Sequence, residues 1–337
     1  MTNAHDSRLS RRGFCLCCLG ATTFATTGGW LTPSQVFAEA RGIVDSIRGA
    51  AAAAPIKIHK LRNNVSVIEG SGGNVAVLTG QDGKVLIDAG ITASRPRIQD
   101  ALSGLSKDPV RQLINTHWHF DHTGGNENFG RAGAVIIAHD NVRQRMSTDQ
   151  VMAAINEKVS ASPGVALPVV TFGDGVTLHL NGDTLHVVHV ANAHTDGDSI
   201  VHWQNANVLH MGDTFFHRES FPFIDLDSGG SIDGVIAAAE KGLQASNEQT
   251  RIIPGHGPVA TRAELAAYRA MLVDIRGKVA AGIAAKRTLA QIQASKPAAR
   301  YGMPDGFIKP DRFVEFVYNS LRAAPAKGPT RTKRHRH

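Results

Sequence analysis

The side chains in this chain with the clearest capacity for chemistry lie in residues 116–122, which read T-H-W-H-F-D-H. Within this segment four side chains are of types that bind metal ions: His117, His119, Asp121 and His122. They follow a predicted strand over residues 110–117. Because side chains alternate along an extended backbone, we expect the first three of them on one side. A catalytic zinc takes three protein ligands and keeps one position open, so four ligand types in one short segment predict two metal ions.

Further ligands for two metals must come from elsewhere in the chain, and three segments offer them. His194 lies in A-H-T-D-G-D, Asp213 in G-D-T and His256 in G-H-G-P, each directly after a predicted strand. Small residues and glycines beside them allow the backbone to turn tightly and bring the side chain inward. A single histidine or aspartate at a strand end is more often structural. Four such segments in one chain favour a shared metal site.

The elements that must position these residues alternate between strands and helices. Turn signals separate short β-rich runs, and Gln81-Asp82-Gly83 predicts a hairpin turn. Strands are predicted over 56–61, 65–70, 74–80, 84–90, 110–117, 134–139, 199–203, 208–213 and 251–255, with a hairpin over 178–190 and helices near 94–105 and 231–245. Sheets covered by helices are expected, in an α/β layered domain. From residue 261 to 321 the pattern is mostly helical.

Cysteine placement excludes one class of site. All three cysteines lie before residue 19, as Cys15, Cys17 and Cys18. The rest of the chain therefore has neither a disulfide nor a thiolate metal ligand.

The N-terminal segment is interpreted as a targeting signal. Ser10-Arg11-Arg12-Gly13-Phe14 precedes a weakly apolar run that is too short, and too rich in glycine and threonine, for a membrane-spanning helix. This arrangement resembles a bacterial twin-arginine export signal, with processing expected after Ala38 or Ala40. We therefore expect export by the twin-arginine machinery to the periplasm, without stable membrane insertion. The alternative is a chance arginine pair in a frayed terminus.

The net charge of +7 is concentrated at the chain ends. Residues 323–337 carry five basic residues and no acid, residues 1–40 carry a net +1, and about +1 remains for residues 41–322. A nearly neutral body gives no reason to expect a nucleic-acid partner. The tail is interpreted as a solvated, disordered end.

The motifs H-x-H-x-D-H, A-H-T-D-G-D, G-D-T and P-G-H-G-P, in this order over roughly residues 56–260, resemble those of the metallo-β-lactamase-fold hydrolase superfamily. The resemblance implies a four-layer αβ/βα sandwich with a dinuclear metal site at one edge. It assigns His117, His119 and His194 to one metal. It assigns Asp121, His122 and His256 to the second, with Asp213 bridging both. Asp88, which ends V-L-I-D-A-G, would orient a ligand or the core loop; the alternative is a turn-forming aspartate before Gly90.

Four regions are predicted on this basis. Residues 1–40 form a twin-arginine signal peptide, 41–260 the hydrolase domain, 261–325 a C-terminal helical extension and 326–337 a basic disordered tail. The expected cofactor is a pair of zinc ions, with iron or manganese possible.

The expected reaction is hydrolysis of a small molecule, in which a metal-bridging hydroxide attacks an ester, thioester, lactone or β-lactam carbonyl. Asp121 would orient the nucleophile and shuttle its proton. A β-lactamase proper, a phosphodiesterase and a dinuclear-iron redox protein remain as alternatives. The non-enzymatic alternative is a binding protein with a degenerate metal site. The chain lacks a recognisable glutathione-binding motif and the tyrosine of lactonase-like members. The phenylalanines after Asp213 form either an apolar substrate wall or ordinary core: Phe215, Phe216, Phe221 and Phe223.

Overall fold

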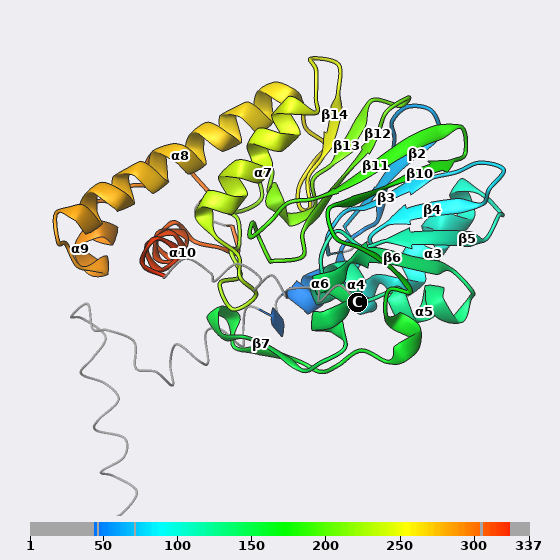
Figure 1. Ribbon diagram of the computed structural model, residues 1–337, viewed down its shortest axis with the longest axis horizontal. Coiled ribbons are helices and arrows are strands. Elements are labelled where there is room, and N and C mark those ends of the chain that lie inside the picture. The colour runs from blue at the N-terminus through cyan, green and yellow to red at the C-terminus, as the bar shows by residue number, and fades with distance from the viewer. Residues whose placement is uncertain (1–43, 46, 71, 304–305, 324–337) are drawn as a thin grey trace, which may run out of the picture.

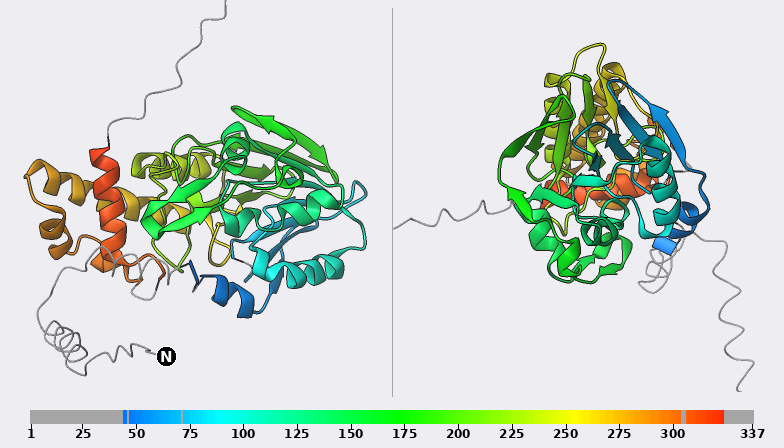
Figure 2. Two further views of the ribbon diagram at one scale, coloured as in Figure 1. Left: turned by 90° about the horizontal axis from the view of Figure 1, so that it is seen from below. Right: turned by 90° about the vertical axis from the view of Figure 1, so that its right-hand side faces the viewer.

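The computed structural model describes residues 44–45, 47–70, 72–303 and 306–323. The predicted signal peptide and the basic tail beyond residue 325 lie outside these residues. Two β-sheets face each other, and helices cover the outer face of each (Figures 1 and 2). The α/β sandwich with C-terminal helices is thus confirmed, while the exact domain division stays a prediction.

The first sheet has seven strands in the order β1-β2-β3-β4-β5-β6-β9. The first four are antiparallel neighbours, and parallel pairing then runs from β4 to β9. Every residue of β3 and β4 is buried, as expected for strands covered on both faces. The bounds are β1 Lys57–Lys60, β2 Val65–Glu69, β3 Val75–Leu78, β4 Lys84–Ile87, β5 Val110–Ile114, β6 Val135–His139 and β9 Val170–Phe172.

The second sheet has five strands in the order β10-β11-β12-β13-β14. Antiparallel pairing of β10 with β11 confirms the hairpin predicted over residues 178–190. Apolar side chains of both sheets, among them Val67, Ile114 and Trp203, form the core between them. The bounds are β10 Gly175–Leu180, β11 Asp183–His189, β12 Ser199–Trp203, β13 Val208–His210 and β14 Arg251–Ile253.

Helices complete the four layers. Helix α3 (Arg95–Leu105) and α5 (Asn126–Arg131) pack on the first sheet, where Ile98 and Phe129 join its outer core. Helix α6 (Asp140–Met146) follows β6. Helix α7 (Ile232–Gln244) and the long α8 (Arg262–Ala284) lie against the second sheet (Figure 1). The Thr261 hydroxyl and the Glu264 carboxylate form a capping box that fixes the start of α8.

The C-terminal helices pack back onto the loop that follows Asp213. Helix α9 (Leu289–Ala294) and α10 (Pro310–Arg322) follow α8. On α10, Phe313 stacks on Phe221 at 5.2 Å between ring centroids, and Phe316 meets Phe223 edge-on at 5.4 Å. The extension is therefore part of the same core. Among the described residues, no helix has the length and apolarity needed to cross a membrane.

Shorter elements connect the main helices and strands. They include one helical turn after the T-H-W-H segment, a two-stranded ribbon, and a helical segment over residues 47–53. The bounds are α4 Phe120–Thr123, β7 Gln150–Met152, β8 Glu157–Val159, and the 3₁₀ turns η1 Thr92–Ser94, η2 Ala153–Ile155, η3 Gly164–Ala166, η4 Gly212–Thr214 and η5 Ala299–Tyr301.

One local expectation was wrong. Strand β5 ends at Ile114, earlier than predicted, and Asp121 lies in helix α4 instead of extended backbone. The extended stretch stops at His119, whose φ of −63° and ψ of 149° place it just before the helical turn. As a result Asp121 does not group with His117 and His119.

Candidate metal centre

All seven predicted metal ligands meet at one edge of the sandwich, in the loops and short helical turns that follow strand ends. His117 and His119 lie after β5, and His194 lies after β11. Asp213 lies after β13 and His256 after β14. The parallel partners β13 and β14 end side by side, so the residues that follow them meet at the same edge. The seven side chains form two groups, within each of which the ligand atoms lie within 4.8 Å of one another.

We call the first group the histidine cluster: His117, His119 and His194. All three side chains are buried. The His119 Nδ1 and His194 Nε2 atoms approach to 2.8 Å. Each imidazole also has a hydrogen bond at its outer nitrogen. His119 donates from Nε2 to Asp225 Oδ2 at 2.9 Å, and His194 donates from Nδ1 to the Phe223 carbonyl at 2.8 Å.

The third imidazole is held through a neighbouring hydroxyl. Thr116 Oγ1 donates to Asp88 Oδ2 at 2.7 Å, so its proton is already used and His117 Nδ1 donates to it at 3.0 Å. With the outer nitrogens of all three histidines acting as donors, the inner nitrogens carry lone pairs. This is the tautomer that a metal ion requires of histidine ligands.

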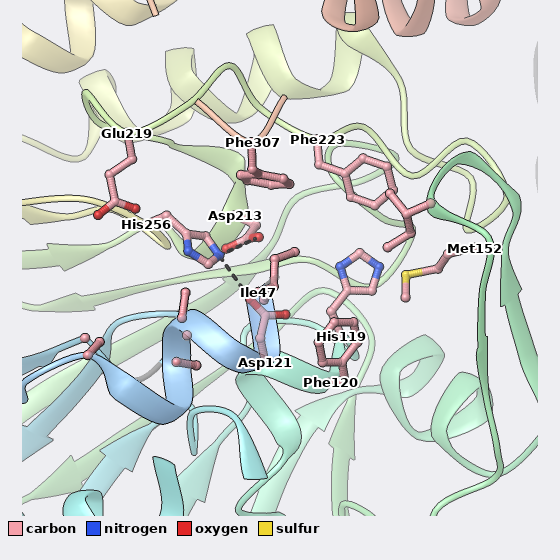
Figure 3. A pocket seen from close by; sticks show the side chains of 16 residues that line it. Ile47, His119, Phe120, Asp121, Met152, Asp213, Glu219, Phe223, His256 and Phe307 are labelled. Carbon is pink, nitrogen blue, oxygen red and sulfur yellow. Dashed lines mark ion pairs between the residues drawn. The ribbon is translucent and has the colours of Figure 1, made fainter. Parts of the chain in front are cut away.

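We call the second group the mixed cluster: Asp121, His122, Asp213 and His256. His256 Nε2 lies 3.1 Å from Asp121 Oδ2 and 3.4 Å from Asp213 Oδ2 (Figure 3). His122 Nε2 lies 2.9 Å from Asp213 Oδ1. Asp213 Oδ2 is also 3.6 Å from His194 Nε2. The Asp213 carboxylate therefore lies between the two clusters, where the resemblance places a bridging ligand.

Unsatisfied buried atoms show that this donor set fits metal ions. His117 Nε2, His122 Nε2 and Asp213 Oδ1 are buried and make no hydrogen bond of good geometry. Buried polar atoms without partners are rare and costly. In the histidine cluster two inward lone pairs face each other at 2.8 Å, an arrangement that a cation between them would stabilise. Imidazole and carboxylate ligands without thiolate suit zinc, iron or manganese.

The two clusters shift histidine protonation in opposite directions. Burial lowers the pKa of His194 to about 4, and burial together with the nearby His122 holds the pKa of His117 well below its usual range. Burial also opposes the charged form of His256, but Asp213 and Asp121 outweigh it and raise its pKa to about 10. Asp213 is correspondingly held well below the usual carboxyl pKa by the neighbouring imidazoles, despite its burial. The mixed cluster thus favours positive charge, whether from protons or from a metal ion.

Asp88 connects the clusters from behind. It adopts a left-handed backbone conformation with φ of +63°, and its side chain is fully buried. Its carboxylate accepts hydrogen bonds from the Thr116 amide at 2.7 Å and from His122 Nδ1 at 2.8 Å. Of the two interpretations left open by the sequence, orientation of a ligand and of the T-H-W-H loop agrees with these contacts.

Two glycines lie so close to ligand side chains that a Cβ atom at either position would collide with a ligand. A Cβ atom at Gly255 would lie 2.0 Å from Asp213 Oδ1, and one at Gly73 would lie 2.2 Å from the His122 ring. Neither position can accept a side chain without displacing a ligand.

Sequence reasoning missed the residue that holds His119. Asp225 lies 106 positions from it along the chain and is held in turn by Ser228, whose hydroxyl donates to Asp225 at 2.5 Å. Asp225 lies in the segment F-I-D-L-D-S-G-G, over residues 223–230, whose composition indicates a polar turn. No feature of that segment indicates a contact with a metal ligand. The phenylalanines of this region divide between the two roles considered. Phe223 lines the cavity beside the centre, whereas Phe215 and Phe221 are fully buried in the core.

A cavity of about 270 Å³ opens directly onto the metal centre (Figure 3). Its floor is formed by His119, Asp121, Asp213 and His256. Asp121 is 9% exposed. A small molecule in this cavity therefore meets ligands of both clusters.

Comparison with known proteins agrees with this geometry. The chain is 28% identical to a hydroxyacylglutathione hydrolase of Anaeromyxobacter dehalogenans, covering 66% of this chain and 78% of that protein. Another enzyme of that name, from Nitrosococcus oceani, is 31% identical over 44% of this chain and 48% of its own length. An acyl-coenzyme A thioesterase of Homo sapiens is 24% identical over 58% of this chain and 73% of that protein. The chain thus spans about half the length or less of several of its curated relatives.

Solved structures share the fold. A metallo-β-lactamase from Pontibacter korlensis superposes with a TM-score of 0.52 at 20% identity, covering 65% of this chain and all of that one. A sec-alkylsulfatase from Pseudomonas sp. superposes with a TM-score of 0.57 at 15% identity, over 86% of this chain and 56% of that one. The family model of the metallo-beta-lactamase superfamily matches residues 68–260, more than half of the sequence. The chain therefore belongs to the metallo-β-lactamase superfamily.

Proposed function

We propose that the protein is a hydrolase that uses two metal ions, in its functional form zinc, to cleave an ester, thioester, lactone or β-lactam bond of a small molecule. The observation that carries the proposal is the position of Asp213 between two clusters of buried, inward-facing ligand atoms. The histidine cluster would hold one ion and the mixed cluster the other, and Asp213 would contact both. When bound, such a pair of ions activates water and stabilises the negative charge that develops on the attacked oxygen.

The residues of the chain would position the reactants around this centre. Asp121 faces the cavity, and His256 lies against its carboxylate at 3.1 Å. Burial opposes ionisation of Asp121, but the neighbouring histidines outweigh it and lower its pKa to about 2. An ionised carboxylate at the cavity floor can accept a hydrogen bond from water and orient it.

Thioesters are the substrate class that the relatives favour. A hydroxyacylglutathione hydrolase and an acyl-coenzyme A thioesterase are both named for hydrolysis of an acylated thiol. In that reaction water adds its oxygen to the acyl carbon, the carbon–sulfur bond breaks, and the thiol leaves with a proton.

Purified protein tests the proposal through its metal content and its activity on a substrate panel. Elemental analysis should give about two zinc ions per chain. The same sample is then assayed with nitrocefin, lactones, thioesters and bis(p-nitrophenyl) phosphate. Turnover of one carbonyl class, lost with a chelator and restored by zinc, supports the proposal. Two irons with a visible absorption band, or no metal uptake at all, would overturn it.

Export to the periplasm is proposed from the sequence alone, because the arginine pair lies outside the described residues. Replacing Arg11 and Arg12 together by lysine should retain the full-length chain in the cytoplasm. Unchanged periplasmic recovery of this double variant would contradict the proposal.

A further inference from the structure

The cavity at the metal centre has walls that come from outside the segment that defines the family. The family match covers residues 68–260. One wall is formed by Ile47, Ala50, Ala51 and Ala54, on and just after the helical segment 47–53. Phe307, which precedes α10, forms another (Figure 3). The shape of the cavity is therefore a property of this chain beyond the shared sandwich.

The N-terminal wall is fixed to the sandwich by polar contacts. Arg97 donates to the carbonyls of Ala51 and Ala52, at 2.5 and 2.6 Å, and the Ser94 hydroxyl donates to Ala51 at 2.9 Å. Arg48 pairs with Glu157 at 2.5 Å and lies over the Phe120 ring. These contacts hold the segment at a fixed position relative to the metal centre. The segment therefore limits the size of the group that fits between it and the metal ligands.

The remaining lining is apolar, and among the described residues its one charged side chain outside the metal centre is the acidic Glu219. Phe120, Met152, Ile155 and Phe223 complete the walls around the floor. Glu219 is exposed and lies at the cavity (Figure 3). Among the described lining residues there is no lysine or arginine. The apolar walls favour an uncharged apolar group, and the Glu219 carboxylate disfavours a negative charge close to it.

The volume sets the size of that group. At about 270 Å³ the cavity lies near the lower end of the range for small-molecule sites, about 300 to 1,000 Å³. A short or medium acyl chain fills such a space. A bulky conjugate such as a glutathionyl or nucleotidyl group must extend beyond it.

We propose that this cavity is an acyl-binding pocket, in which segment 47–54 and Phe307 select substrates with an uncharged apolar acyl group of short to medium length on a leaving group without negative charge. This inference rests on the proposed hydrolase function and names its substrate class. Ala50 leaves room for the acyl chain, because its side chain is small and lines the cavity. Glu219 acts against anionic thiols.

Acyl-chain length is the first test. Zinc-loaded protein is assayed with S-acyl-N-acetylcysteamine thioesters from acetyl to decanoyl, whose leaving thiol is neutral. Each added methylene that enters the pocket should raise kcat/KM by about fourfold, until the pocket is full. The Ala50→Phe variant should lower the octanoyl-to-acetyl ratio of kcat/KM by at least about tenfold. Ala53→Phe is the matched control, because Ala53 is exposed on the same segment and does not line the cavity.

Charge is the second test. Wild-type protein should prefer S-octanoyl-N-acetylcysteamine to S-octanoylglutathione. Glu219→Lys should raise the relative kcat/KM of the glutathione conjugate by about threefold to tenfold. Asp100→Lys, which makes the same charge change at an exposed position of α3 away from the cavity, should leave the ratio unchanged.

Binding without turnover separates the two proposals. Calorimetry should detect octanamide binding to the protein, with Ala50→Phe weakening it at least tenfold relative to Ala53→Phe. Octanamide binding without hydrolysis of any thioester would contradict the hydrolase function while supporting an apolar pocket. Thioester hydrolysis that is indifferent to chain length, or faster with the glutathione conjugate in wild-type protein, would overturn the acyl-pocket inference alone.

Discussion

In the histidine cluster three imidazoles are positioned by hydrogen bonds to their outer nitrogens, whereas in the mixed cluster two carboxylates set the charge. His194 and His117 have depressed pKa values because burial disfavours their charged form. His256, with two aspartates beside it, has its pKa raised to about 10 even though it too is buried. Metal binding at the histidine cluster should therefore depend mainly on the orientation of its ligands, and metal binding at the mixed cluster on its negative charge. Substitutions that change one without the other should separate these two dependencies.

The largest effect is expected at Asp213, which both clusters share. Asp213→Asn keeps the size of the side chain and removes its charge, so metal binding should weaken at both clusters. We expect kcat/KM to fall at least about 10³-fold, because metal-based charge stabilisation is worth several kcal/mol. Elemental analysis should show fewer than two metals per chain.

Asp100→Asn is the control for the lost charge, since Asp100 is exposed on α3. Two tightly bound metals and near-wild-type activity in Asp213→Asn would contradict a shared ligand.

A smaller effect is expected when one cluster is disabled at a time. His119→Ala removes a ligand of the histidine cluster, and His122→Ala removes one of the mixed cluster. Each variant should retain about one metal per chain and lose about 10²-fold or more in kcat/KM. Isothermal titration with zinc measures both stoichiometries.

His179→Ala serves as the control, because this histidine is exposed on β10. If either single variant bound two metals, the assignment of ligands to clusters would be incorrect.

Substitutions behind the ligands should cost less, with Asp225 supporting the histidine cluster alone and Asp88 supporting ligands of both clusters. Asp225→Asn weakens the acceptor that holds His119, and Asp88→Asn weakens the acceptor of His122 and Thr116. Loss of such supporting contacts costs about 10- to 100-fold in metal affinity. Competition with a chromophoric chelator should show weakening of one of the two binding steps in Asp225→Asn. Equal weakening of both steps in that variant would argue against the division into two clusters.

The smallest effect is expected at Ser228, which contacts Asp225 and not a metal ligand itself. The Ser228 hydroxyl donates to Asp225 and accepts a hydrogen bond from Trp118 Nε1 at 3.1 Å. Ser228→Ala should lower the free energy of unfolding by about 1 kcal/mol and weaken metal binding only a few-fold. Chemical denaturation and the same chelator competition measure the two effects. A loss of metal affinity as large as that of Asp225→Asn would show that Ser228 does more than orient the carboxylate.

The sandwich and the candidate ligands could be predicted from the sequence, because both depend on patterns among residues close together in the chain. Strand periodicity is local, and each ligand lies in a short motif directly after a strand. The supports of the ligands are not local. Asp225 reaches His119 across 106 positions, and Phe307 meets the cavity from a segment with no motif at all.

Side-chain alternation alone would have grouped the ligands wrongly, whereas the family resemblance assigned Asp121 to the second metal. An extended backbone would have placed Asp121 beside His119. The turn of helix α4 instead brings Asp121 toward His256 in the mixed cluster. Where a strand ends within a motif depends on tertiary packing, and alternation of side chains could not reveal it.

We propose that the two clusters bind two metal ions that share Asp213. Anomalous diffraction at the zinc edge from crystals of the zinc-loaded protein tests it most directly. We expect two peaks about 3.5–4 Å apart. One should lie within about 2.0–2.2 Å of the inner nitrogens of His117, His119 and His194 and the other equally close to ligands of the mixed cluster, with Asp213 contacting both. A single peak, or two peaks of which only one touches Asp213, would contradict it.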